Sequence, residues 1–381
     1  MAGGRTSIVV AAALAAVALA VAGAAPGGST KAKVPGLQFL GQVTMPTATQ
    51  FPAGGPLFGG LSGIAYDEGR GIYYTLSDAT GAPAVGPVRF YTLRVDLADG
   101  HLDAGDVQVL SMTTLKGPDG QPLAAGTTDP EGIALTKDDR LVVTSEGFAN
   151  QLVDPWIRFF GLDGTQTGSL TVPTAFLPNA AATRGVRLNL AFESAATAPN
   201  GRFLFTGTEG ALVQDGPAAS LTARSPARIL RYNLQSGRPD REYVYWTDTI
   251  AEVPVPATNF AVNGLVELLP LNNQFLLAME RSFSVGAPDT GNTIKLYSVK
   301  VAGATNVAGV ESLAGSLDTT RAVEKTLLLN LDTLGIPLDN VEGMTFGPKL
   351  PDGRQSLILV SDNNFAATHF TQFLLFAVAK S

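Results

Sequence analysis

Cysteine is absent from this chain of 381 residues, and histidine occurs only twice, as His101 and His369. Without cysteine the chain forms no disulfide and carries no lipid-modified cysteine anchor, even if its destination is oxidising. Cysteine and histidine together also provide too few ligands for a structural zinc site. The net charge is −7 and no cluster of basic residues occurs, which argues against nucleic acid as a partner.

Familiar catalytic signatures are missing as well. The chain has no HExxH, no P-loop and no GxSxG, since residues 60–63 read Gly-Leu-Ser-Gly without the intervening residue. Nothing therefore indicates a serine nucleophile paired with a histidine, and a triad hydrolase is not expected. Amphipathic helical periodicity is also nearly absent after the N-terminal segment, which excludes a predominantly helical fold.

The N-terminal segment has the pattern of a signal peptide. Arg5 supplies a positive charge, residues 8–21 form an Ala-rich apolar run, and Ala22-Gly23-Ala24 resembles a cleavage site. A membrane anchor is the alternative, but the run is shorter than the ~20 residues needed to cross a bilayer. We predict a signal peptide at 1–24, a short linker at 25–36, and a bacterial protein that is periplasmic or secreted, with no membrane anchor after cleavage.

A β-hairpin unit recurs five times along the chain. In residues 129–147, apolar runs at 132–135 and 141–144 flank a polar turn at 137–139. Glu131 stands at the entrance of this hairpin and Glu146 at its exit. Similar hairpins appear at 61–78, 189–210, 262–283 and 341–364. Short strands punctuated by 42 glycines and 24 prolines are typical of an all-β fold.

Further β-rich runs complete each unit. A third run follows all five hairpins and a fourth run follows four of them, whereas residues 37–45 supply a spare strand. This pattern predicts an all-β β-propeller with five four-stranded blades, closed by the N-terminal strand. A sixth, degenerate blade is the alternative. We expect one domain over residues 37–381, and a monomer.

The propeller predicts where acidic side chains meet. The inner strand of each blade and the strand returning beside it bring the entrance and exit of every hairpin to one opening of the central channel. The residues expected there are Ser62, Asp78, Glu131, Glu146, Glu193, Glu209, Asn263, Glu280, Glu342 and Asp362. Because neighbouring carboxylates repel one another unless a cation neutralises them, we predict a Ca²⁺ site. The candidate ligands are Asp78, Glu131, Glu146, Glu280, Glu342 and Asp362.

Each of these side chains also has a structural interpretation. Acidic residues, Ser and Asn at strand ends commonly cap turns or accept backbone N–H bonds. Acidic residues nevertheless recur at matched positions of the hairpins, which favours a ring of acidic side chains around the channel opening. Its strongest candidates are Glu131, Glu146, Glu342 and Asp362. For Glu267, early in the fourth unit, an outward orientation is the alternative.

Two basic side chains could take part in chemistry at this opening. His369 lies between the second and third strands of the last unit, on the same face as the acids, and is a candidate general acid or base. An exposed loop histidine is the alternative, as expected for His101. Arg281, together with Asn263, is a candidate for binding substrate. For Arg281, an ion pair with a neighbouring carboxylate is the structural alternative.

The repeated segments resemble a known family. They read LSGIAYD…LSD, DPEGIAL…TSEG, NLAFES…TGTEG, GLVELL…LLAMERSF and NVEGMTFGP…LILVSDNN. Over about residues 37–378 these motifs resemble the family described as "esterase-like activity of phytase". The resemblance implies a propeller hydrolase of ester or phosphoester bonds, by analogy with calcium-dependent propeller phytases. The Lys and Arg side chains needed to grip a polyphosphate are not evident at the opening, which favours smaller esters over phytate.

Three functions are compatible with a propeller fold, a ring of acidic side chains and this family resemblance. The first is a secreted, metal-assisted hydrolase of small esters or phosphoesters, in which Ca²⁺ polarises the ester and Glu193 or Glu209 accepts a proton. The second is a lactonase, since other propellers open lactone rings with acids and amides around one calcium. The third is a non-catalytic propeller that binds a ligand or protein and whose calcium is structural.

Overall fold

The computed structural model describes residues 36–379, and these residues form five four-stranded antiparallel sheets. The expected signal peptide at 1–24 and nearly all of the linker at 25–36 lie outside the described residues. The described helical elements are four short 3-10 turns at Ala149–Gln151, Thr174–Phe176, Leu317–Thr319 and Leu331–Leu334. Within the described part of the chain, no helix is long and apolar enough to cross a membrane. The prediction of an all-β fold with five blades is confirmed.

Four blades are each built from consecutive strands. Blade 1 contains β2 (Leu61–Asp67), β3 (Ile72–Ser77), β4 (Arg89–Val95) and β5 (Val107–Thr114). Blade 2 contains β6 (Pro130–Leu135), β7 (Leu141–Ser145), β8 (Trp156–Phe160) and β9 (Gln166–Leu170). Blade 3 contains β10 (Ala196–Thr197), β11 (Phe203–Ala211), β12 (Pro226–Asn233) and β13 (Arg238–Trp246). Blade 4 contains β14 (Ala261–Pro270), β15 (Phe275–Ser284), β16 (Asn292–Lys300) and β17 (Glu324–Asn330).

The fifth blade joins the two ends of the described chain. It contains β18 (Asn340–Lys349), β19 (Gln355–Asp362), β20 (Phe370–Val378) and, as its outer strand, β1 (Leu37–Pro46). Strand β1 pairs antiparallel with β20, so that Leu37 lies opposite Val378 and Pro46 opposite Phe370. Closure by the N-terminal strand is therefore confirmed, and backbone hydrogen bonds tie the chain segment that leads into blade 1 to the last blade.

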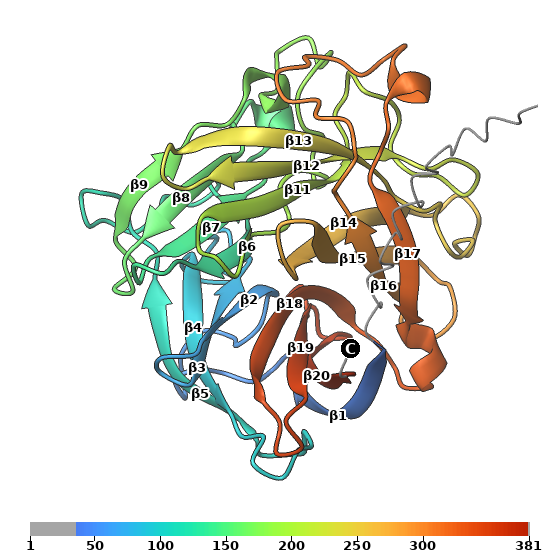
Figure 1. Cartoon of the computed structure of the whole chain (residues 1–381). Coiled ribbons are helices and arrows are strands. Elements are labelled where there is room, and N and C mark those ends of the chain that lie inside the picture. Colours follow the sequence, from blue (N-terminus) through green and yellow to red (C-terminus); the bar gives the residue numbers. More distant parts are fainter. Residues whose placement is uncertain (1–35, 380–381) are drawn as a thin grey trace, which may run out of the picture. The chain divides into compact units, whose positions relative to one another are not determined.

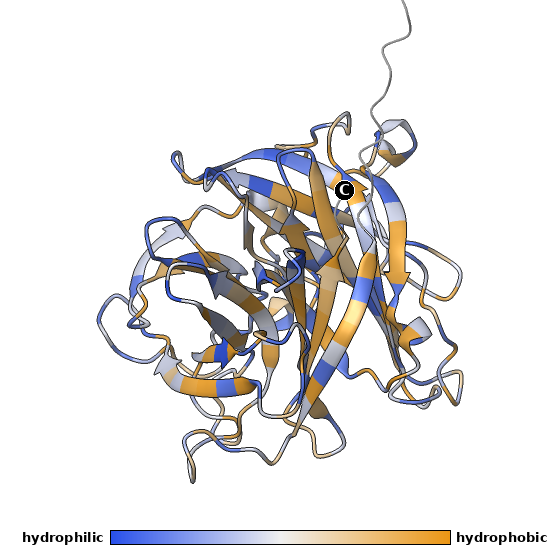
Figure 2. Ribbon diagram, turned by 60° about the horizontal axis from the view of Figure 1, so that its bottom comes forward, coloured by the Kyte–Doolittle hydropathy of each residue, from blue (hydrophilic) through white to orange (hydrophobic). Residues whose placement is uncertain are grey.

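Apolar side chains fill the spaces between neighbouring blades. Successive side chains of a strand point to opposite faces of its sheet. A strand whose sheet packs against a neighbouring blade on each face must therefore be apolar on both faces. In β19, Ile358 and Val360 pack against blade 1, whereas Leu357 and Leu359 pack against blade 4. This is why the second strands read as continuous apolar runs. In Figure 2, apolar colour runs along many of the strands, and polar colour appears on parts of the strands and in the loops.

The first strands of the blades meet around the central axis. Strand β2 contacts both β6 and β18, and β14 contacts β18 as well. Figure 1 shows these strands nearest the centre, with the third and fourth strands of each blade further out. Every first strand begins, and every second strand ends, at the same end of the axis, which brings the hairpin entrances and exits together there.

Candidate active site

A cavity of about 390 Å³ lies at this end of the axis. Its lining combines eight carboxylates with one guanidinium, one imidazole, four amides and three apolar side chains. The carboxylates are those of Asp78, Asp129, Glu131, Glu146, Glu193, Glu209, Glu342 and Asp362. The other lining residues are Arg281, His369, Asn189, Asn292, Asn340, Asn364, Phe260, Val262 and Phe283.

β-Bulges help to turn the acids of the first strands into this cavity. The register of β6 with β7 shifts between Pro130 and Ile133, and that of β18 with β19 shifts between Val341 and Gly343. A bulge leaves an extra residue out of the ladder and re-aims its side chain. The residues within these shifts include Glu131 and Glu342, and both line the cavity.

Glycines next to these acids close the axis beneath the cavity. A Cβ atom on Gly132 would lie 2.5 Å from the backbone nitrogen of Ala195 in the next blade, and one on Gly343 would lie 3.1 Å from Cα of Gly63. Such distances leave no room for a side chain, so the inner strands approach as closely as glycine permits. Further along the strands, a separate cavity of about 1270 Å³ opens at the other end of the axis.

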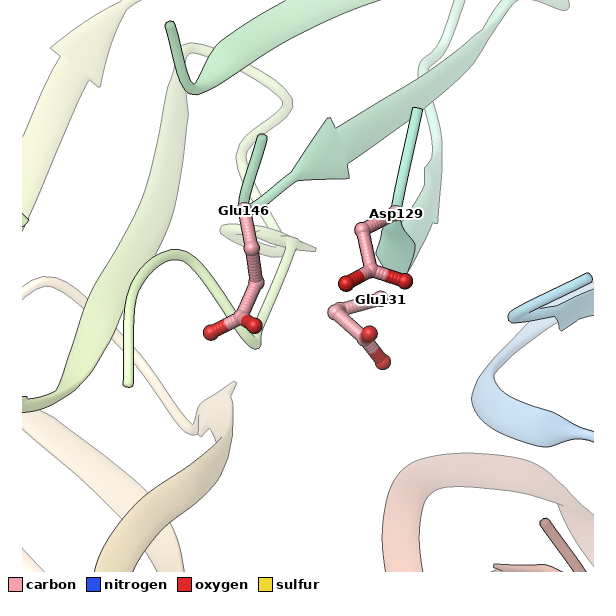
Figure 3. Close-up of side chains that lie close together, drawn as sticks. All are labelled: Asp129, Glu131 and Glu146. Carbon is pink, nitrogen blue, oxygen red and sulfur yellow. The ribbon is translucent and has the colours of Figure 1, made fainter. Parts of the chain in front are cut away.

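Three carboxylates of blade 2 form a first group able to share a cation. One oxygen from each of Asp129, Glu131 and Glu146 lies within 4.8 Å of the others, and Figure 3 shows the three side chains close together. Burial, followed by the charge of Glu342, raises the pKa of Asp129 to about 6. Burial and then the carboxylates of Asp129 and Glu146 hold the pKa of Glu131 well above its ordinary value. The group therefore resists full ionisation unless positive charge is brought in.

A second group shares Glu146 with the first. One oxygen from each of Glu146, Glu193 and Glu209 also lies within 4.8 Å of the others. Burial raises the pKa of Glu146 to about 8, although a hydrogen bond with the carboxyl of Glu193 opposes the shift. Burial raises the pKa of Glu209 to about 7, against the opposing charge of Arg281. Oε1 of Glu209 accepts no hydrogen bond, although the residue is only 2 % exposed.

The acids of blades 5 and 1 complete the ring. Burial, followed by the charge of Glu342, raises the pKa of Asp362 to about 8. Burial and then the charge of Asp362 hold the pKa of Asp78 well above its ordinary value, and Oδ1 of Asp78 has no hydrogen-bond partner. Asp362 accepts a hydrogen bond from the backbone N–H of Asn364 at 2.7 Å, which fixes its orientation.

Arg281 is the only guanidinium in the cavity lining, and it is already paired. Its Nη2 lies 2.9 Å from Oε1 of Glu342 and 3.4 Å from Oε1 of Glu209. Burial alone would lower the pKa of Arg281, but these two carboxylates outweigh burial and raise it above its ordinary value. The structural alternative, an ion pair with neighbouring carboxylates, is the arrangement that Arg281 adopts.

His369 is held by a buried carboxylate. Its Nδ1 lies 2.7 Å from Oδ1 of Asp339, and Asp339 is 1 % exposed. Asp339 also accepts backbone hydrogen bonds from Asn340 at 2.7 Å and Phe370 at 2.6 Å, so its two oxygens act only as acceptors. Nδ1 of His369 must then carry a proton, and in the neutral imidazole Nε2 is the acceptor. Nε2 makes no hydrogen bond with any residue in the described range.

Residues 56–365 match the family described as "Phytase-like: Esterase-like activity of phytase". The chain belongs to the phytase-like family. The resemblance seen in the repeated motifs is thus confirmed. A comparison with curated proteins finds no match.

Solved structures similar to this phytase-like propeller have low sequence identity. An endo-arabinase from Bacteroides thetaiotaomicron is 12 % identical, with a TM-score of 0.44, over 90 % of this chain and 98 % of its own. An α-L-arabinofuranosidase domain from Coprinopsis cinerea is 10 % identical, with a TM-score of 0.46, over 90 % of this chain and 99 % of its own. The tail fibre of Staphylococcus aureus phage P68 is 9 % identical, with a TM-score of 0.38, over 90 % of this chain and 53 % of its own. These similarities carry no conclusion about activity.

Two residues predicted at the opening of the phytase-like propeller lie elsewhere. Glu280 is 1 % exposed and accepts hydrogen bonds from the hydroxyl of Tyr245 at 2.7 Å and the amide of Asn263 at 3.0 Å. Its carboxylate also pairs with Nζ of Lys325. The prediction of Glu280 and Asn263 as cavity residues is wrong, because adjacent side chains of a strand face opposite ways, and Arg281 of β15 and Val262 of β14 take the inward positions.

Two other residues of the inner strands, Ser62 and Glu267, make hydrogen bonds with the backbone and do not line the cavity. The hydroxyl of Ser62 donates to the carbonyl of Pro130 at 3.2 Å and does not line the cavity. Glu267 is 2 % exposed, and its carboxylate accepts the N–H of Leu268 at 2.8 Å and that of Met344 at 3.4 Å. Glu267 therefore points neither into the ring nor outward to solvent.

The sequence interpretation also missed residues of the site. Asp129 stands two positions before Glu131, and Asp339 stands three before Glu342. In both units an Asp stands just upstream of a Glu-Gly pair, and this was a signal present in the sequence. Asp129 lines the cavity, and Asp339 is the partner of His369. The lining asparagines and the apolar residues Phe260, Val262 and Phe283 carried no recognisable signal, because such residues are common in loops and strands.

Proposed function

We propose that this phytase-like propeller is a cation-assisted hydrolase that cleaves ester or phosphoester bonds of small molecules after export from the cell. One observation carries the proposal. One cavity is lined by carboxylate groups suited to a hard cation and by an imidazole whose Nδ1 is held by a buried carboxylate. Each of these features has structural uses by itself. Together they resemble the components of a hydrolytic site.

The donor set of the cavity fits a calcium ion. Its candidate ligands are carboxylate and amide oxygens, and Ca²⁺ prefers six to eight oxygen ligands, whereas no cysteine is present. Oδ1 of Asp78 is buried without a hydrogen-bond partner, as expected for an oxygen that completes its shell with a ligand, and Oε1 of Glu209 has only the ion pair with Arg281 at 3.4 Å. Asp129, Glu131 and Glu146 would hold the ion, with Glu193 and Glu209 beside them. A bound Ca²⁺ would supply positive charge that polarises the ester group and offsets the charge of the ring.

His369 has the arrangement of a general base. With Nδ1–H donating to Asp339, Nε2 can accept a proton from water as the water oxygen attacks the ester. Asp339 then stabilises the imidazolium, which returns the proton to the departing alcohol oxygen, and the products are an acid and an alcohol. Glu209, with a pKa raised by burial to about 7, is a second group able to exchange a proton near neutral pH.

Turnover assays with matched variants test this proposal. The substrates are phosphate mono- and diesters, carboxylic esters and lactones, each with calcium and with a chelator. We expect calcium-dependent hydrolysis of one class, strongly reduced in His369→Gln and Glu146→Gln. Glu324→Gln is the control, since Glu324 lies on an outer strand in exposed ion pairs. Absence of turnover on every substrate, with a melting temperature that still rises with calcium, would overturn the proposal in favour of a binding propeller with a structural ion.

A further inference from the structure

Blade 4 differs from the other blades in what it contributes to the cavity. Blades 1, 2, 3 and 5 each supply at least one carboxylate, whereas blade 4 and the loop before it supply none. Their contributions are Phe260, Val262, Arg281, Phe283 and Asn292. The cavity therefore has one wall without carboxylates, whereas the rest of its lining is rich in them.

The apolar part of this wall is continuous. Val262 of β14 lies directly opposite Phe283 of β15 in the antiparallel register, so their side chains share one face of the sheet. Phe260 precedes β14, and its ring centroid lies 6.4 Å from that of Phe283. Phe260 is 63 % exposed, the largest exposure among the large apolar side chains of the described residues. An aromatic ring held at a cavity opening in this way offers an unused contact surface.

The charge of the cavity argues against an anionic substrate. Arg281 is its one guanidinium, and both its pairing partners are cavity carboxylates. No lining lysine or second arginine remains to pair with a phosphate or carboxylate group. The lining carries eight carboxyl groups against one guanidinium and one imidazole, so no unpaired guanidinium or ammonium group is left to bind an anionic ligand.

We infer that the cavity takes an uncharged ester whose apolar group packs against Phe260, Val262 and Phe283. This inference rests on the proposed hydrolase function and narrows it to carboxylic esters or lactones in place of phosphoesters. The ester group would face the carboxylates and His369, while the apolar group would be covered by the wall of blade 4. Phe260 and Phe283 are then specificity-determining residues that take no part in the proton transfer.

Binding of inert probes tests the inference independently of turnover. Acetanilide, an uncharged phenyl amide, and phenylphosphonate, an anion with the same ring, are titrated into the calcium-loaded full chain and followed by ligand-observed NMR. We expect acetanilide to bind at least about tenfold more tightly than phenylphosphonate. In Phe260→Ala and Phe283→Leu, acetanilide binding should weaken by about five- to tenfold, since a lost aromatic contact is removed. Val255→Ala is the control, because Val255 is 61 % exposed but does not line the cavity.

The outcomes separate this inference from the proposed function. Equal or tighter binding of phenylphosphonate, no binding of acetanilide, or unchanged binding in both phenylalanine variants would overturn the inference. Hydrolysis of phenyl phosphate in preference to phenyl acetate would overturn it while leaving the hydrolase function standing. Binding of acetanilide that depends on Phe260, without turnover of any ester, would leave the inference about the ligand intact and remove the hydrolase function.

Discussion

Nδ1 of His369 lies 2.7 Å from Oδ1 of Asp339, although the two residues are 30 positions apart in the sequence. Asp339 is buried at the start of blade 5, and His369 lies in the loop between its second and third strands. Because the carboxylate also accepts two backbone N–H groups, it is fixed before any ligand arrives. The pair gives the cavity an imidazole whose Nδ1 is held by a buried carboxylate.

Removal of this pair should affect turnover more than folding. His369→Gln should lower kcat by about 10²–10⁴, the usual contribution of a general base. Asp339→Asn should also lower kcat, because an amide can donate to Nδ1 and shift the proton to Nε2, where it blocks proton acceptance. Steady-state kinetics with thermal melting checks both. A loss of kcat matched by unfolding at the assay temperature would show that the pair is structural.

Glu280 should contribute to stability and not to the cation site. Its carboxylate pairs with Lys325 and accepts the hydroxyl of Tyr245, away from the cavity. Glu280→Gln should lower the free energy of unfolding by about 3 kcal/mol, because it breaks a buried ion pair. Calcium affinity, measured by calorimetry, should stay unchanged. Glu131→Gln is the matched comparison, in which calcium affinity should fall; weaker calcium binding in Glu280→Gln would contradict this assignment.

Stability without a cation should fall as pH rises. The carboxyls of Asp129, Glu209, Glu146 and Asp362 have pKa values raised to about 6, 7, 8 and 8 from ordinary values of 3.8 or 4.5. The folded chain thus holds protons that the unfolded chain releases, so the stabilisation is complete below pH about 4 and lost as pH rises to about 8. With a chelator, the melting temperature should drop by on the order of 5 °C between pH 5 and 8.

Calcium should counter this loss selectively. It binds ionised carboxylates, so it should raise the melting temperature more at pH 8 than at pH 5. Melting curves at the two pH values, with calcium or chelator, provide the measurement. An equal effect of calcium at both pH values would show that the ion binds away from the titrating carboxyls.

The glycine beside Glu131 should tolerate no side chain. In Gly132→Ala the new methyl would lie 2.5 Å from the backbone nitrogen of Ala195, so blades 2 and 3 would have to separate. We expect a loss of about 3 kcal/mol in the free energy of unfolding, measured with urea. Gly168→Ala on the outer strand of blade 2 is the control, because its nearest neighbour, a ring carbon of Phe159, is 3.6 Å away. Similar stability of the two variants would show that the inner strands can move apart.

The sequence by itself determined the fold and the general location of the site. Blade number and closure by β1 follow from short-range patterns, since alternation along a strand and turn residues at hairpins act over a few residues. The recurrence of acids at hairpin entrances and exits then placed most of the ring, including Glu131, Glu146, Glu342 and Asp362, which all line one cavity.

Only the tertiary structure decided which side chains face one another. A shift of one residue turns a strand's side chains to the other face, so the pattern of β15 could not distinguish Glu280 from Arg281 as the inward residue. Glu146 and Glu193 come from different blades, and His369 and Asp339 from different segments of one blade. Their proximity depends on bulges, on close packing at glycine and on the curvature of the closed ring, which arise from contacts between residues distant in the chain.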